Sequence, residues 1–238
     1  MRNGEFNLAR ESFTVYQQKA LSDYERLDAL TSQAFVSYVE GNIKRAFTDL
    51  EVMKKMAVEL KSPWYILYES LYKGFMLMET GNPAGAVQAF TTARDLVPTL
   101  AFNSDQVDFA RIYSQGFLSM ALGFNGKSDE AQKELAVAKQ IFDKKPRGQA
   151  STNFMNLYQG LLELNRKNYQ KAIEWMEPGA LLENEVNQYY TGMAYDKSGN
   201  TKKAIEFYTK ANRSLGTNYT AIYLNKTAKR IKELKTSN

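Results

Sequence analysis

Apolar residues recur along this chain at about every third or fourth position, which is the spacing of amphipathic helices. These runs cover nearly the whole sequence and leave little room for strands. Short polar turns interrupt them and repeat one phrase, in which a glycine followed by Asn or Lys precedes an alanine by five residues. The phrase stands at 41–46, 81–86, 126–131 and 199–204, and Lys167 replaces the glycine at 167–172. One helical hairpin copied along the chain predicts an all-α stack.

The residues around each turn keep the same register from copy to copy. Small residues stand seven places before each turn: Ala34, Gly74, Ser119, Gly160 and Gly192. Large apolar residues stand four places after each alanine: Leu50, Phe90, Leu135, Met176 and Tyr208. Because small residues let two antiparallel helices approach closely, we expect the large residues to fill the seams between hairpins.

This register is similar to that of the tetratricopeptide repeat family. The best copy reads Gly74, Leu77, Gly81, Ala86, Phe90, Ala93 and Pro98. The resemblance covers nearly the whole chain and implies a right-handed α-α superhelix of helical hairpins, typical of a bacterial repeat protein. The phrase alanines are 40, 45, 41 and 32 residues apart, whereas the family period is about 34. Longer helices or loops are therefore expected in the early repeats, and Pro178 is expected to cut one late helix short.

The chain is predicted to form a single solenoid domain, 1–238, of about five and a half hairpins. The predicted units are a partial hairpin 1–22, repeats 27–60, 67–100, 112–145, 153–184 and 185–218, and a capping helix 219–238. Residues 4–16 repeat the turn-and-alanine pattern without a preceding helix, so the chain is predicted to be the C-terminal part of a longer protein. A native N-terminal helix with a chance resemblance is the alternative.

Composition restricts the chemistry. The chain has no His and no Cys, so Ser-His-Asp and Cys-His catalysis and the usual zinc sites cannot be built. No glycine-rich phosphate loop occurs, and we expect no catalytic residues, no metal and no cofactor. Residues 1–124 carry a net charge of −2 and residues 125–238 a net charge of +7. We interpret the excess as a solvated lysine-rich surface rather than an acidic-partner site, and expect no nucleic-acid binding.

No apolar run approaches the roughly 20 residues that span a membrane, and no signal peptide is visible. The compartment is not fixed by the sequence: the cytoplasm is slightly favoured, and the periplasm stays open if the N-terminus is truncated.

The resemblance also implies which residues face the concave side of the stack. Counted back from each turn, these positions are apolar and rich in aromatics and methionine. The predicted partner-binding groove comprises Phe35, Tyr38, Tyr68, Leu71, Phe75, Met78, Tyr113, Met120, Phe154, Tyr189 and Met193. Such a lining suits an apolar or amphipathic helical segment of a protein partner. Burial of part of this stripe as core by superhelix curvature is the alternative.

The sequence thus predicts a non-catalytic protein–protein interaction scaffold. Two alternatives stay open: a regulatory or sensor segment C-terminal to a catalytic domain, and a scaffold that self-associates through its N-terminal hairpin. Lys and Asn, which clamp chaperone tails in relatives, are missing from the corresponding positions, where Leu71 and Phe75 stand instead. A chaperone-tail function is therefore not expected.

Overall fold

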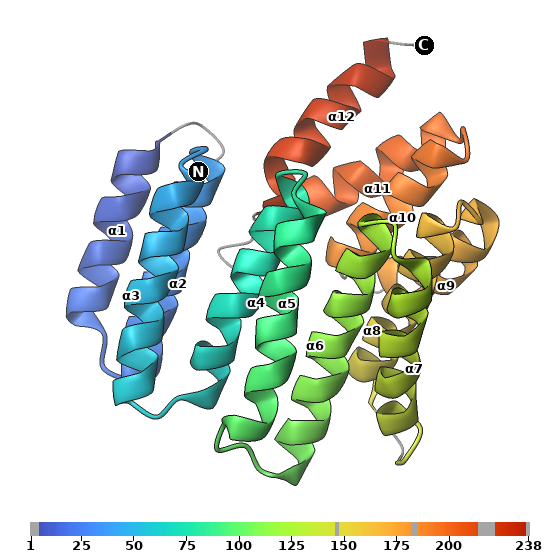
Figure 1. The fold of residues 1–238 in the computed structure, drawn as a ribbon. Helices are drawn as coiled ribbons and strands as arrows, with labels where there is room; N and C mark the ends of the chain where they lie inside the picture. Colours follow the sequence, from blue (N-terminus) through green and yellow to red (C-terminus); the bar gives the residue numbers. More distant parts are fainter. Residues whose placement is uncertain (1–4, 146–147, 182–184, 214–221, 237–238) are drawn as a thin grey trace.

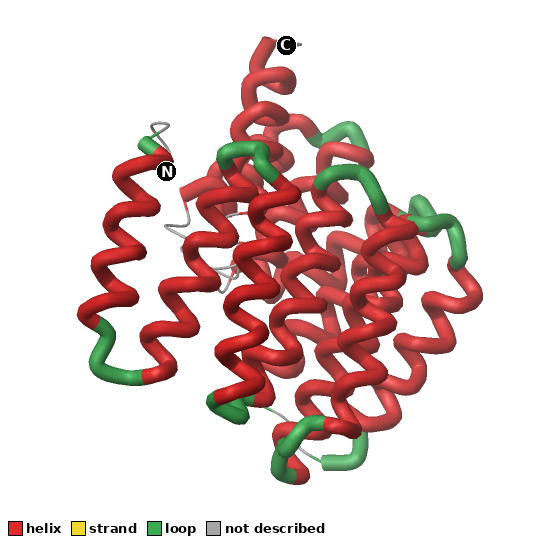
Figure 2. Tube along the Cα trace, turned by 60° about the vertical axis from the view of Figure 1, so that its left-hand side comes forward, coloured by secondary structure: helices red, strands yellow, loops and turns green. Residues whose placement is uncertain are grey.

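The computed structural model describes residues 5–145, 148–181, 185–213 and 222–236, and these form helices joined by short turns (Figures 1 and 2). The α-helices are α1 (Phe6–Lys19), α2 (Asp23–Val39), α3 (Ile43–Glu59), α4 (Pro63–Glu79), α5 (Pro83–Leu96), α6 (Ser104–Phe124), α7 (Ser128–Phe142), α8 (Gln149–Asn165), α9 (Tyr169–Leu181), α10 (Glu185–Lys197), α11 (Thr201–Arg213) and α12 (Leu224–Thr236). A 3₁₀ turn, η1 (Val97–Thr99), follows α5. Each helix packs on its neighbours in the chain, which confirms the predicted all-α solenoid.

The repeated turn phrase marks the junction between the two helices of a hairpin. Its glycine adopts a positive φ, from 78° at Gly126 to 92° at Gly41, and glycine reaches this region without steric cost. The next residue, where it is Asn, caps the second helix: Asn82 Oδ1 accepts a hydrogen bond of 2.9 Å from the Gly85 amide. In the fourth hairpin Lys167 takes the same left-handed conformation, with a φ of 65°. The phrase therefore encodes one helix end and one helix start.

The small residues of the register lie against the large ones within each hairpin. A Cβ added at Gly74 would stand 2.5 Å from Phe90, and one at Gly192 would stand 2.9 Å from Tyr208. Phe90 also stacks on Phe117 of the next hairpin, with ring centroids 5.8 Å apart. The large residues thus fill the space inside a hairpin as well as the seam to the next one.

One helix departs from the expectation drawn from proline. Pro178 was expected to cut the second helix of the fourth hairpin short, but α9 continues through it to Leu181. Pro178 loses one intrahelical hydrogen bond and its ring crowds the preceding turn, and the packing of the buried Gly179 and Ala180 beyond it offsets this cost.

The stack curves strongly, with the first helices of the hairpins inside the curve. The hydroxyl of Tyr189 on α10 donates a 3.1 Å hydrogen bond to Glu79 on α4, although the two residues are 110 positions apart. Helix α12 packs on α11 and protrudes from the middle of the molecule (Figure 1). The curve therefore brings the last hairpin and α12 to the carboxyl ends of α2 and α4.

Candidate functional site

Most of the eleven predicted groove residues lie inside the packed core. Seven of them have exposed fractions of 9 % or less: Phe35, Leu71, Phe75, Met78, Tyr113, Met120 and Tyr189. Four are partly exposed: Tyr38, Tyr68, Phe154 and Met193. Phe35 packs against Tyr72 on α4, and Phe75 packs against Phe90 and Phe117, so these two rings belong to the core. The accessible four divide between two regions.

The first region is an aromatic band formed by the amino-terminal halves of α4, α6 and α8 and by the turn that precedes α6. It comprises Trp64, Tyr68, Phe102, Phe109, Tyr113 and Phe154, all but Tyr113 partly exposed. Trp64 lies 4.6 Å from Phe102 and 5.8 Å from Phe109, and Tyr113 lies 5.1 Å from Phe154, measured between ring centroids. The rings thus connect three successive hairpins.

The band is extended towards the N-terminus by tyrosines. Tyr24, which is 65 % exposed, packs edge-on against Tyr65 at 5.5 Å, and Tyr65 lies 5.5 Å from Tyr68. The Tyr65 hydroxyl donates a 2.7 Å hydrogen bond to Asp28 Oδ1. Burial raises the pKa of Tyr65, and this bond to Asp28 raises it further, so the hydroxyl stays a donor. The rings are therefore held in fixed orientations.

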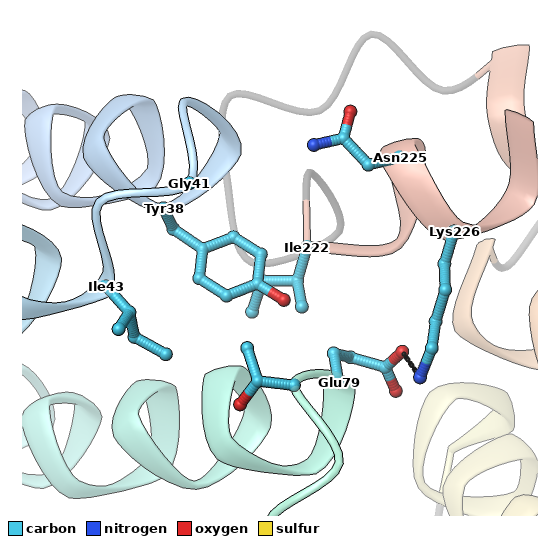
Figure 3. Close-up of a pocket in the computed structure, with 8 residues that line it drawn as sticks. Tyr38, Gly41, Ile43, Glu79, Ile222, Asn225 and Lys226 are labelled. Carbon is cyan, nitrogen blue, oxygen red and sulfur yellow. Dashed lines mark hydrogen bonds and ion pairs between the residues drawn. The ribbon is translucent and has the colours of Figure 1, made fainter. Parts of the chain in front are cut away.

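The second region, the Glu79 centre, comprises Glu79, Tyr189, Tyr190 and Lys226. Glu79 is the last residue of α4, and its side chain is 4 % exposed. Its carboxylate accepts hydrogen bonds from Tyr189 Oη at 3.1 Å, Tyr190 Oη at 3.4 Å and Lys226 Nζ at 3.0 Å. Figure 3 shows the Lys226 side chain extending along one wall of a pocket to meet this carboxylate. A single carboxylate therefore joins α4, α10 and α12.

Burial dominates the electrostatics of the Glu79 centre. It raises the pKa of Glu79 above its ordinary value, and Lys226 and the two tyrosine hydroxyls offset only part of that effect. Burial followed by the Glu79 charge raises the pKa values of Tyr189 and Tyr190 far above the ordinary range. Both tyrosines are thus permanent hydrogen-bond donors to the carboxylate.

Two pockets flank Lys226. One of about 260 Å³ is lined by Tyr38, Gly41, Ile43, Glu79, Thr80, Ile222, Asn225 and Lys226 (Figure 3). The other, of about 340 Å³, is lined by Tyr189, Met193, Asp196, Lys197, Tyr208, Lys226 and Arg230. Tyr38 and Met193, the remaining accessible groove residues, are found in these walls.

Several residues of both regions were missed from the sequence. Trp64, Phe102 and Phe109 lie outside the repeat register, although their aromatic character was a usable signal. Glu79 and Lys226 are 147 positions apart, and nothing in the sequence pairs them. Among the described residues, no group of acidic side chains is arranged to hold a metal ion, and no helix is long and apolar enough to cross a membrane.

Comparison with known families finds one relevant similarity. Residues 192–214, which begin on α10 and run into α11, match the family model for a tetratricopeptide repeat. No curated protein matches the chain. The matched stretch contains Gly192, Gly199, Ala204 and Tyr208, which are the register positions described above.

Proposed function

We propose that this helical-hairpin solenoid, in which residues 192–214 match a tetratricopeptide repeat model, binds a partner protein along the aromatic band. Folds built on this repeat are typically non-catalytic and serve as protein–protein interaction scaffolds. The proposal places the partner segment, an apolar or amphipathic helix, across α4, α6 and α8. The supporting observation is the continuous series of ring contacts from Trp64 to Phe154, in which every ring except the buried Tyr113 is partly exposed.

The chemistry of the band suits such a segment. Tryptophan and tyrosine are the side chains most often responsible for binding energy at protein interfaces, because they bury large area at low entropic cost. The rings of Trp64 and Tyr68 are already packed against neighbouring rings, 6.0 Å apart, so little ordering is needed on binding. Tyr68 and Phe154 belong to the groove predicted from the sequence. The proposed binding surface retains these two partly exposed residues and leaves out the buried ones.

A matched pair of variants tests the proposal. The double variant Tyr68→Ala with Phe154→Ala removes two partly exposed rings of the band, whereas Trp175→Ala removes a ring that is 43 % exposed on α9, outside it. We expect partners captured by wild type and by Trp175→Ala to be lost with the double variant. Titration of the captured segment should then show at least about tenfold weaker binding to the double variant.

Two outcomes of the same experiment would contradict the proposal. If the double variant keeps its helical circular-dichroism signal and captures the same partners as wild type, the band is not the binding surface. Equal loss with Trp175→Ala would place binding elsewhere on the solenoid.

Self-association is a second candidate, supported by the surface of α1. No residue of α1 is buried, and Leu8, Val15 and Tyr16 are 58 %, 45 % and 41 % exposed. This apolar face is proposed to pack on the same helix of a second copy. Light scattering over a concentration series tests it: a dimer that Leu8→Lys dissociates supports the proposal, and a monomer at the highest concentration refutes it.

A further inference from the structure

Lys226 occupies an unusual place in its own helix. It lies in the first turn of α12, which carries no acidic residue there. The amino-terminal end of a helix is electrostatically positive, so a lysine in this turn is disfavoured by its own helix. Its Nζ instead lies 3.0 Å from the Glu79 carboxylate at the end of α4. The position of Lys226 is therefore explained by what it meets on α4, not by α12.

The receiving surface is built to attract a cation. Glu79 closes α4, and the backbone oxygen of Val39, the last residue of α2, accepts a 3.0 Å hydrogen bond from Asn225 Nδ2. Carboxyl ends of helices carry partial negative charge, and two of them meet here beside a buried carboxylate. The hydroxyls of Tyr189 and Tyr190 on α10 donate to that carboxylate and fix its orientation.

The segment 222–226 makes specific contacts at this surface. Ile222 and Tyr223 are 2 % and 3 % exposed, and the Tyr223 ring lies 4.5 Å from that of Tyr189. Lys226, however, keeps 48 % of its side chain exposed while its partner carboxylate is buried. Pockets of about 260 Å³ and 340 Å³ lie on its two sides. The Lys226 side chain therefore reaches the carboxylate without being enclosed by the protein.

We infer that the surface formed by Glu79, Tyr189 and Tyr190 is a recognition site for a lysine of a basic helical peptide in a partner protein, and that residues 222–226, with Lys226, occupy it in cis. The partner peptide presents an aromatic residue three positions before its lysine, as Tyr223 precedes Lys226. An occupant on the same chain competes at high effective concentration, so the partner binds when it displaces the cis segment. The site lies at the opposite ends of the first helices from the aromatic band and is independent of binding there.

The rest of α12 is fixed by other contacts, which makes the inference testable without unfolding the chain. Arg230 donates two hydrogen bonds, of 2.7 and 2.9 Å, to the Asp196 carboxylate on α10. Thr227 donates to Asn212 Oδ1 on α11 at 3.1 Å. Loss of Lys226 therefore leaves α12 attached to the last hairpin.

The test uses the full-length chain and a fluorescein-labelled synthetic peptide with the sequence of residues 222–236. By fluorescence anisotropy, Lys226→Ala should bind this peptide at least about tenfold more tightly than wild type, because the cis competitor has lost its ion pair. Adding Glu79→Gln to Lys226→Ala should reverse the gain. A peptide in which the position of Lys226 carries alanine should bind Lys226→Ala at least about tenfold more weakly.

Two further variants serve as controls for the peptide-binding test. Lys229→Ala removes a lysine of the same helix whose side chain is 81 % exposed, and it should bind the peptide like wild type. Asn225→Ala, which frees the Val39 oxygen, should also tighten peptide binding and serves if Lys226→Ala does not fold. Equal affinity of wild type and Lys226→Ala, or of Lys226→Ala with and without Glu79→Gln, would overturn the inference. A dimer that forms only when Lys226 is present would assign the trans occupant to a second copy and also overturn it.

Discussion

Helix α4 carries two buried glutamates that are paired with different parts of the molecule. Glu69, in the middle of the helix, is 5 % exposed and meets cations from its own surroundings: Lys73 one turn along at 2.6 Å, and Lys54 on α3 at 3.0 Å. Glu79, at the end of the helix, meets groups from α10 and α12. The first links adjacent helices, and the second links remote parts of the solenoid.

The electrostatic balance differs accordingly. Burial alone would raise the pKa of Glu69, but hydrogen bonds from Lys73 and Lys54 outweigh it and hold the pKa below its ordinary value. At Glu79 burial wins, and the pKa is raised. A carboxylate whose charge is favoured by its surroundings contributes to folding stability, whereas one whose charge is disfavoured costs stability and is more easily explained by recognition. The contrast separates a carboxylate whose charge is favoured by nearby lysines from one whose charge is disfavoured by burial.

The largest expected change in the free energy of unfolding follows from removing Glu69, which is paired with Lys54 and Lys73. Glu69→Ala should lower the free energy of unfolding by about 2 kcal/mol, less than a fully buried pair would lose because both lysines can reach water. Urea denaturation measures it. Glu51→Ala is the matched control: Glu51 also bonds Lys73, at 3.0 Å, but is 58 % exposed, so its loss should cost under about 0.5 kcal/mol. Equal losses in the two variants would show that burial of Glu69 does not matter.

The pH dependence should have opposite signs at the two glutamates. Glu69 stabilises the fold above the unfolded-state pKa of about 4.5, and this contribution is lost as the pH falls through its lowered folded-state pKa. The Glu79 contribution is fully present below about 4.5 and is lost as the pH rises through its raised folded-state pKa. Unfolding of wild type, Glu69→Gln and Glu79→Gln across a pH series measures both differences. Differences from wild type that change with pH in the same direction would remove the distinction.

The sequence predicted the hairpin and a superhelix, but not how tightly the superhelix curves. The phrase at Gly81 and Asn82 encodes a left-handed helix end and a capped helix start, both local effects, and the pairing of Gly74 with Phe90 needs only the register. The depth of burial of Phe75 and Met120 depends on how far successive hairpins rotate, which small packing differences set over many residues. No periodicity reports that rotation. The ion pair between Glu79 and Lys226 is a consequence of the same curvature and is invisible for the same reason.

The smallest expected effect is that of Glu79→Gln on stability, and it distinguishes a role of Glu79 in folding from a role in binding. At neutral pH, Glu79→Gln should change the free energy of unfolding by less than about 1 kcal/mol, with any change towards greater stability. The neutral amide keeps an oxygen that can accept from Tyr189 and Tyr190, and the half-exposed Lys226 is hydrated when its partner charge is removed. Urea denaturation of this variant beside Glu69→Gln, which retains shape but loses the favoured charge, gives the comparison. If Glu79→Gln is the more destabilised of the two, Glu79 is a structural link like Glu69. If it is stable, and if adding Glu79→Gln to Lys226→Ala abolishes binding of the peptide of residues 222–236, the charge at the end of α4 is there for binding rather than folding.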